Sequence, residues 1–384
     1  MTSSTDPAAA VQTPAARTPS RRVTSLDVVR GLMLCVSVGV NSLLATPAWF
    51  DHAGWVGVNG LDLVFPVFVT LTGCGLGFAM HRRTNVRTLA RRVLVLVAAG
   101  LLYNALTTNA WDPGTWRFTG VLQLYAGVVV VIVLGHLLTR SARGWFVVTT
   151  VLAVTWTTVL AWFATTCAGG ELTRECNPSG VVDLAVFGAP HVYWQGAAGH
   201  DPEGLLATLG ACVSAAAGAT VGHLVLSRPG PRACLRPVLL VVAGFLALAA
   251  ATTWVPELLT GQAVPLMKRL WTPPFALLVG AGVCLALLLG HLLLDRPSAP
   301  TGLRRVVWPL EALGRNSLLV YFGSHVVMAL LGHHAGADGR NLAQRVADTV
   351  AVAGHPQLSF TVLALLVWGA IAAVLHRRRI YLRP

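Results

Sequence analysis

The sequence contains little charge, and negative charge is especially scarce. Only 11% of its 384 residues are charged, and 15 acidic side chains stand against 28 lysines and arginines, which gives a formal net charge of +13. Hydrophobic residues make up 55% of the chain, too large a share for a soluble protein of this length. The arginines cluster in short gaps between apolar runs, so the positive charge indicates membrane topology rather than nucleic-acid binding.

Motifs that would carry several other kinds of chemistry are missing as well. No CxxC pair or His/Cys cluster has the spacing of a zinc site, and we expect no metal. No glycine-rich strand–loop–helix motif is present, which argues against a Rossmann or P-loop cofactor site. No internal repeat is visible, which argues against the inverted-repeat transporter folds.

What the sequence does contain is a series of apolar runs of about 20 residues, the length that spans a bilayer as a helix. The ninth run is the least regular, because it carries Glu311, Arg315 and Asn316, and polar backbone at that depth is tolerated only against protein or a wet cavity. We predict an all-α polytopic membrane protein, a bundle of about ten transmembrane helices at residues 25–45, 60–80, 89–107, 119–139, 144–165, 204–226, 236–255, 273–294, 311–332 and 358–376.

The basic residues predict the orientation of this bundle. If the N-terminus is inside, all but six of the 28 lysines and arginines fall in inner segments, so both termini are expected to be cytoplasmic in a multi-pass plasma (inner) membrane protein. Residues 1–24 are expected to form a disordered tail without a signal peptide, and residues 25–384 the transmembrane domain. The six basic residues that fall in outer segments are Arg117, Arg174, Lys268, Arg269, Arg340 and Arg345.

Two of the seven cysteines, Cys167 and Cys176, fall in the largest outer connection, at about residues 166–203. They would lie on the oxidising side of the membrane, where a disulfide between them is plausible, although the sequence does not decide whether they are bridged. The other five cysteines lie in or beside predicted helices and are expected to be small packing residues.

The most informative stretch runs from Val36 to Met80. Two apolar runs flank a short connection that carries Asp51 and His52, with Asn41 inside the first run and Asp62 at the start of the second. Polar groups near lipid are costly, so a functional reason for keeping them should be sought.

Several segments of the chain resemble one known family. They are SLDVVRGL (25–32), DHAGWVGVNGLDLVFPVFV (51–69), TGVLQL (119–124), DPEGLLATL (201–209), KRLWTPPFALLVGAG (268–282), LGRNSLLVYFGSHVV (313–327) and HRRRIYL (376–382). Together they resemble the heparan-alpha-glucosaminide N-acetyltransferase family of transmembrane acyltransferases, which includes bacterial relatives. The resemblance covers nearly the whole chain from Ser25 onward, and the segment around His52 is its most specific part.

The resemblance implies a reaction divided between the two sides of a membrane. Acetyl-CoA would arrive from the cytoplasm, and an amino-sugar nitrogen would accept the acetyl group at the outer face. His52 matches the histidine taken as catalytic, Asn41 the polar partner near the acetyl group, and Asp62 a neighbouring acid. Gly54 and Val56 replace polar residues of the animal enzymes, so the acceptor is not inferred from the resemblance.

The chemistry of these residue types supports the same assignment. Imidazole titrates nearest neutrality, so His52 can accept the proton of an attacking nucleophile, or attack the thioester itself and carry the acetyl group. Asn41 can donate to the developing oxyanion, or simply hydrogen-bond another helix. Asp62 or Asp51 can orient the imidazole ring, and Asp62 can equally cap its own helix. His52 itself can be an interfacial histidine that only bonds a neighbouring loop.

Cations near the cytoplasmic ends suit the phosphates of CoA. Arg30, Arg315 and Asn316 are our candidates for donor binding, although most such arginines serve orientation or anionic lipid, and Arg30 can simply pair with Asp27. Other cations on that side include Arg82, Arg83, Arg91, Arg92, Arg304 and Arg305.

On the outer side, Trp55 is the aromatic residue we expect to stack on a sugar, whereas an interfacial aromatic belt explains most of its neighbours. Asp201 and Glu203 can bind the acceptor or cap the helix that follows them.

The sequence therefore predicts an acetyl-CoA-dependent transmembrane acyltransferase with a glycan or amino-sugar acceptor, N-acetylation being favoured over O-acetylation. A transporter of a small anion or lipid-linked sugar, using the same polar cavity, is the alternative. Membrane lipids are the other expected partners, and no nucleic acid is expected. The small residues Gly210, Ala215, Gly218 and Gly222 allow close helix contacts, within the chain or in a homo-oligomer.

Overall fold

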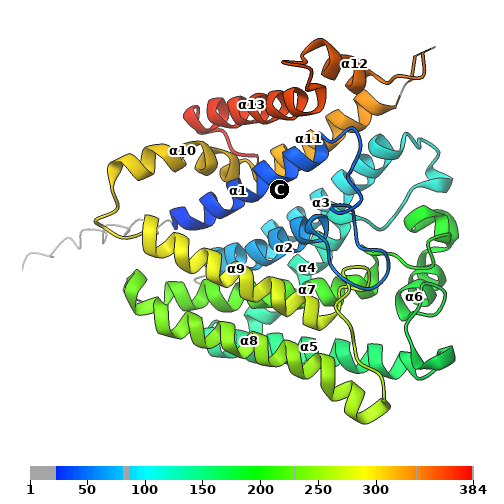
Figure 1. The fold of residues 1–384 in the computed structure, drawn as a ribbon. Coiled ribbons are helices and arrows are strands. Elements are labelled where there is room, and N and C mark those ends of the chain that lie inside the picture. Colours follow the sequence, from blue (N-terminus) through cyan, green and yellow to red (C-terminus); the bar gives the residue numbers. More distant parts are fainter. Residues whose placement is uncertain (1–22, 81–85, 229, 334, 337, 383–384) are drawn as a thin grey trace, which may run out of the picture.

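The computed structural model describes residues 23–80, 86–228, 230–333, 335–336 and 338–382. The predicted tail up to residue 22, Arg82 and Arg83 lie outside the described residues. The described part forms α-helices and short 3-10 helices without a strand (Figure 1). Its α-helices are α1 Thr24–Asn41, α2 Gly60–Met80, α3 Val86–Thr108, α4 Val121–Leu138, α5 Ala142–Ala164, α6 Pro178–Phe187, α7 Leu205–Leu226, α8 Pro231–Thr260, α9 Pro273–Leu294, α10 Thr301–Arg315, α11 Ser317–Gly332, α12 Leu342–Thr349 and α13 Pro356–Arg377.

The prediction of an all-helical, polytopic membrane protein is confirmed. Nine of the described helices (α1 to α5, α7 to α9 and α13) are long and apolar enough to cross a membrane, and all nine begin and end close to predicted spans. The predicted continuous helix at 311–332 is wrong, because the structure divides it at Asn316 into α10 and α11. The backbone of Asn316 has φ −111° and ψ 27°, outside the helical region.

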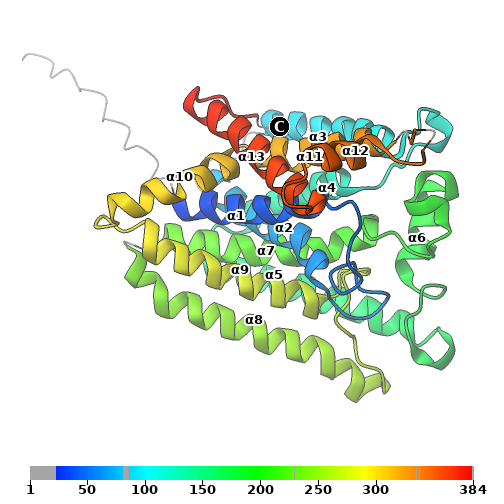
Figure 2. The same ribbon diagram turned by 45° about the horizontal axis from the view of Figure 1, so that its top comes forward.

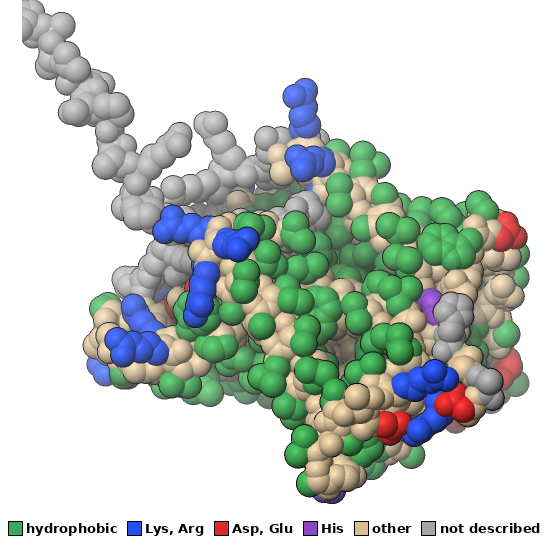
Figure 3. Space-filling view, turned by 90° about the horizontal axis from the view of Figure 1, so that it is seen from above, with side chains coloured by type: hydrophobic (Ala, Val, Ile, Leu, Met, Phe, Trp, Pro, Cys, Tyr) green, Lys and Arg blue, Asp and Glu red, His purple; other side chains and the backbone are tan. Residues whose placement is uncertain are grey.

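The long helices lie side by side, and most of the segments that connect them lie at the two ends of the bundle (Figures 1 and 2). One end, which we call the His52 end, holds the α1–α2 connection (42–59), α6 and the start of α13. The opposite end, which we call the terminal end, holds the start of α1, α10 and the end of α13. Figure 3 shows one face of the molecule, where hydrophobic side chains cover most of the middle and charged side chains lie toward the margins.

Helix α7 lies at the centre of the bundle and packs against α2 and α5 most extensively. Its small residues allow this, because a Cβ atom on Gly218 would overlap the carbonyl oxygen of Thr70 in α2, and one on Gly210 would overlap that of Trp271. On the other side of the same contact, a Cβ on Gly73 would overlap the carbonyl of Ala215. The predicted close helix contacts are therefore made within the chain, and they fix α2, which begins beside His52.

A second glycine contact brings α10 against α1. A Cβ on Gly31 would overlap the carbonyl oxygen of Leu310, and a Cβ on Gly314 would overlap that of Asp27. This crossing ends α10 next to α1, so that Arg315 comes to line the same cavity as Arg30.

We expect Gly218→Ala to destabilise the folded bundle by about 1–3 kcal/mol, because the added methyl group has no room against Thr70. Thermal unfolding of the purified protein in detergent measures the change. Gly282→Ala is the matched control, since a Cβ on this exposed glycine of α9 meets nothing within 4 Å. Alanine is the better helix former, so helix propensity alone would stabilise both variants; an equal loss in both would contradict a role for the α2–α7 contact.

Candidate active site

The structure brings His52 and Asp62 together at the end of α2. Nδ1 of His52 lies 2.6 Å from Oδ1 of Asp62. The other carboxylate oxygen of Asp62 accepts hydrogen bonds from the backbone N–H groups of Ala53, at 3.0 Å, and Asn59, at 2.9 Å. Asp62 is 1% exposed, whereas the side chain of His52 is 38% exposed. One buried carboxylate therefore holds both the imidazole and the loop that carries it.

This arrangement follows from the position of Asp62 in the first turn of α2, where the helix dipole and the unbonded N–H groups favour an anion. Asp51, the other acid predicted to orient the ring, instead accepts the backbone N–H of His52 at 2.7 Å. With Nδ1–H donated to Asp62, Nε2 is the ring nitrogen that can accept a proton or attack an acyl group.

His52 opens onto a cavity of about 530 Å³ at the His52 end. Two arginines in its wall also hold the His52 loop, because Arg174 donates to the carbonyl of Gly54 and Arg269 to that of Ala53, both at 3.2 Å. Trp194, in the same wall, has a left-handed backbone with φ 48°, an uncommon and strained conformation for a bulky residue. The described lining residues are Asp51, His52, Arg174, Glu175, Tyr193, Trp194, Gly196, Ala197, Ala198, Gly199, His200 and Arg269.

A disulfide joins Cys167 and Cys176, the pair that the sequence left undecided. The segment between them supplies the carbonyl of Leu172, which accepts the indole N–H of Trp55 at 2.7 Å. Trp55 packs against a buried apolar cluster and is not one of the residues that line the cavity. The disulfide-bonded segment therefore supports the His52 loop from outside, through Trp55 and through Arg174.

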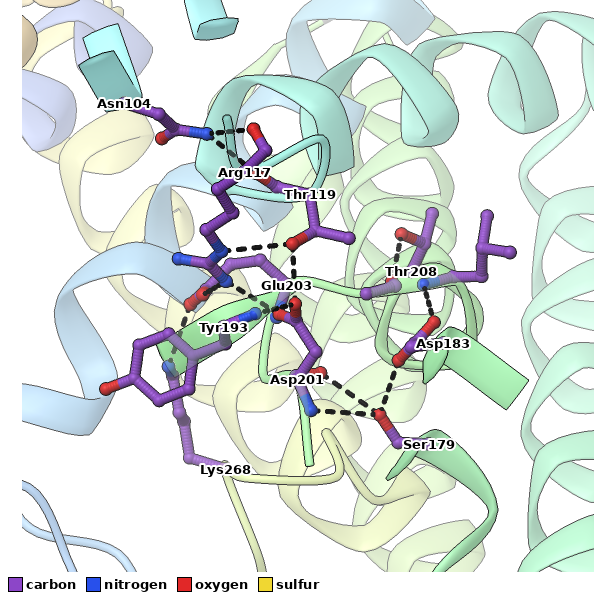
Figure 4. Close-up of polar contacts among 12 residues, drawn as sticks. Asn104, Arg117, Thr119, Ser179, Asp183, Tyr193, Asp201, Glu203, Thr208 and Lys268 are labelled. Atoms are coloured by element: carbon purple, nitrogen blue, oxygen red, sulfur yellow. Dashed lines mark hydrogen bonds and ion pairs between the residues drawn. The ribbon is translucent and has the colours of Figure 1, made fainter. Parts of the chain in front are cut away.

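Asp201 and Glu203, our candidates for acceptor binding, are engaged in a buried network of ion pairs (Figure 4). Arg117 lies 2.6 Å from Asp201 and 2.9 Å from Glu203, and Lys268 lies 3.2 Å from Glu203. Burial alone would raise the pKa of Glu203, but the charges of Lys268 and Arg117 and their hydrogen bonds outweigh it and hold the pKa at about 2. The network ties α7 to the 113–119 connection and to the segment before α9.

A second cavity, of about 380 Å³, opens on the terminal end between α1, α2, α3, α4, α10 and α11. Arg30, Arg92 and Arg315 line it, and Asp27 is the one acid among its described lining residues. Arg30 also donates to the carbonyl of Leu71 at 2.9 Å. Asn316 is fully buried, donates to the carbonyl of Ala312 at 3.1 Å, and does not line the cavity.

Asn41 lies at the end of α1 and donates its side-chain amide to the hydroxyl of Ser324 in α11, at 3.0 Å. This is the helix-to-helix hydrogen bond that the sequence offered as the alternative to a catalytic role. Asn41 lines neither cavity. Across the described residues, no group of three or more His, Cys, Asp or Glu side chains has an arrangement that could hold a metal ion.

The two cavities share no described lining residue. Phe68, Tyr125 and Tyr321 line the second cavity. Phe68 lies 5.4 Å from Tyr321 in an edge contact, and Phe65, one turn along α2 from Asp62, lies 5.4 Å from Tyr125. Phe65 and Phe68 therefore lie along α2 between Asp62 at its start and Thr72 and Gly75, which line the second cavity. We call Phe65, Phe68, Tyr125 and Tyr321 the aromatic layer.

Comparisons with known proteins agree with this geometry. The family model described as heparan-alpha-glucosaminide N-acetyltransferase, catalytic, matches residues 22–196, which contain the His52–Asp62 pair and the disulfide. The chain is 24% identical to the heparan-alpha-glucosaminide N-acetyltransferase of Homo sapiens over 94% of its own length, and 24% identical to that of Mus musculus over 95%. The chain is thus similar to heparan-alpha-glucosaminide N-acetyltransferases along nearly its whole length. The chain spans 59% and 61%, respectively, of the length of these relatives.

Sequence reasoning missed the most prominent polar residues in the wall of the His52 cavity. Arg174 and Arg269 were noticed only as exceptions to the excess of positive charge on the inner side. Their place on the outer side, against the general excess of positive charge on the inner side, could have identified them as site residues, because both line the cavity and contact the His52 loop. Tyr193 and Trp194, in the same wall, are outer aromatic residues that an interfacial belt would also explain.

We expect Glu203→Gln to destabilise the protein by about 3 kcal/mol at neutral pH, because it leaves the buried Lys268 without its carboxylate. The carboxylate has a lowered pKa, so its contribution is present above its ordinary pKa of about 4.5 and is lost as the pH falls toward 2. The difference in thermal stability between wild type and variant should therefore shrink as the pH falls below about 4.5.

Asp338→Asn is the control for this measurement, because Asp338 pairs with Arg345 on the surface, where both side chains are 50% exposed. Its effect at neutral pH should be small. A Glu203→Gln deficit that does not change with pH would contradict the lowered pKa.

Proposed function

We propose that this protein is a transmembrane acetyltransferase that moves an acetyl group from acetyl-CoA to an amino sugar or another glycan acceptor. The observation that carries the proposal is the His52–Asp62 pair, in which a buried carboxylate fixes the ring while the ring stays open to a cavity. Similarity to relatives that are named N-acetyltransferases supports transfer to nitrogen rather than oxygen.

His52 would act through Nε2, in one of two ways. As a general base, it takes the proton from the attacking amine while the nitrogen forms a bond to the thioester carbonyl carbon and the CoA thiolate leaves. As a nucleophile, it forms an acyl-histidine that the amine then attacks. In the first route the amine proton passes through His52 to the departing thiolate. In the second route the thiolate leaves without a proton when the acyl-histidine forms; the amine proton goes to Nε2 as the acyl–Nε2 bond breaks and is then released to water. Asp62 stabilises the imidazolium or acyl-imidazolium form in both routes.

The cavity at the terminal end is our proposed donor site, because its three arginines suit the phosphates of CoA. Asn316 would act indirectly, by ending α10 immediately after Arg315. The distribution of basic residues supports a cytoplasmic terminal end, with both termini inside and the His52 end facing out of an inner membrane. Asn41, held by Ser324, would have to leave that hydrogen bond to reach the acyl oxygen.

The acceptor would enter the His52 cavity, where Tyr193 and Trp194 offer aromatic surface and Asp51 and Glu175 offer carboxylates for an amine. Trp55, Asp201 and Glu203 would support this site by positioning the His52 loop and the segments around it. For the thioester to reach His52, the aromatic layer of Phe65, Phe68, Tyr125 and Tyr321 has to shift, which makes side-chain movement in this layer part of the reaction.

The experiment is acetyl transfer by the purified protein in detergent, with labelled acetyl-CoA and added glucosamine. We expect His52→Ala to lower the rate of transfer by about 10²–10⁴-fold, the usual contribution of a positioned acid–base group. Asp62→Asn should lower it by about 10²-fold or more, because the amide no longer fixes the ring or stabilises its positive charge. His355→Ala, which removes an exposed histidine at the same end, is the control.

A short incubation without acceptor distinguishes the two routes, since label retained on the wild type but not on His52→Ala would indicate an acyl-histidine. The proposal fails if the thioester is never cleaved. It also fails if the protein in proteoliposomes moves a labelled solute across the membrane, in a way that depends on His52, while acetyl-CoA stays intact. That result would support the alternative prediction of a transporter.

A further inference from the structure

The chain turns back on itself after α13. The backbone N–H groups of Arg378, Arg379 and Ile380 bond to carbonyls in the last turn of the helix, and Arg379 has a left-handed φ of 57°. This turn directs the following residues back past the end of α10 toward α1 and α11 (Figure 1). Leu382 consequently lines the arginine-lined cavity together with residues of α1, α2 and α11.

Tyr381 lies over the guanidinium group of Arg315, with 4.0 Å between the guanidinium carbon and the ring centroid. Its hydroxyl lies 3.2 Å from Nδ1 of His376, so the ring is held at both its face and its tip. Glu311, on the same helix as Arg315, lies 3.7 Å away, beyond hydrogen-bond distance. The ring of Tyr381 therefore lies against the face of this guanidinium.

A ring on the face of a guanidinium has a specific consequence. The N–H donors of arginine lie in the plane of the group, so stacking fixes that plane without using the donors, and a fixed plane suits the two-point binding of phosphate oxygens. The cavity beside it carries Arg30, Arg92 and Arg315 against Asp27 alone among its described lining residues. The charge of the cavity thus favours a polyanion.

We infer that residues 378–382 form one wall of the donor site and that Tyr381 is a positioning residue, which sets the plane of Arg315 for a phosphate group of the donor. This inference rests on the proposed function, because it takes the cavity at the terminal end as the CoA site. It goes beyond that function in making residues 378–382 part of the site.

A second cation–π contact in the same region provides the control for the test. Arg377 lies over the ring of Trp308 at 5.3 Å, which is a contact of the same kind between the last residue of α13 and α10. Neither of these residues lines the cavity. Loss of this second contact should therefore disturb the packing of α10 against α13 without changing the plane of Arg315.

The experiment uses the full chain in detergent, with wild type, Tyr381→Leu, Tyr381→Phe and Trp308→Leu. The measurements are the Kd of CoA and the KM and kcat for acetyl-CoA. We expect Tyr381→Leu to raise Kd and KM by about 2- to 30-fold, the range given by loss of one cation–π contact, with kcat unchanged. Tyr381→Phe keeps the ring and should stay within about 2-fold of wild type, as should Trp308→Leu.

A double-mutant cycle sharpens the test. If Tyr381 acts through Arg315, the substitution Tyr381→Leu should add little to the loss already caused by Arg315→Ala. Additive losses would show that Tyr381 acts independently and would overturn the inference.

Unchanged or tighter CoA binding by Tyr381→Leu would also overturn it, as would an equal loss in Trp308→Leu. These outcomes leave the proposed function standing, because the wild type still binds CoA and transfers acetyl. If the wild type binds no CoA, the proposed function fails and this inference fails with it.

Discussion

The position of the His52 ring depends on one buried carboxylate, that of Asp62. Removing a carboxylate from water is costly, and three hydrogen bonds, from the imidazole and from two backbone N–H groups, compensate Asp62 for that loss. The position of Asp62 is in turn set by α2, whose glycine and alanine contacts with α7 hold it at the centre of the bundle. The tight packing of two apolar helices thus determines where an exposed imidazole stands.

The long spans could be predicted because an apolar run of about 20 residues has few alternatives to a membrane helix. The break at Asn316 could not be predicted in the same way. It accompanies the crossing of α1 and α10 at Gly31 and Gly314, a contact between residues almost 300 positions apart. A local pattern of hydrophobic residues carries no information about such a crossing, so one continuous helix was expected where two occur.

In the candidate site, too, local sequence predicted some features, whereas contacts between distant residues could not be predicted. Residues 52 and 62 could be paired from their types and spacing, but the choice of Asp62 over Asp51 required the turn of the loop. Asp201 and Glu203 were expected to bind the acceptor or to cap the following helix, but their ion-pair partners, Arg117 and Lys268, are more than 60 positions away. Four of the six cations predicted on the outer side contact these acids or the carbonyls of the His52 loop.

The bridge between Cys167 and Cys176 has a consequence for the biogenesis of the protein. It closes the short segment that holds Trp55 and, through Arg174, the backbone beside the imidazole. If this end faces the oxidising compartment, as we propose, the bridge forms only after the segment has been translocated. The reaction centre of the newly made protein would then become fully ordered only after translocation. Formation of the disulfide would be the step that distinguishes the active protein from a chain that has only been inserted into the membrane.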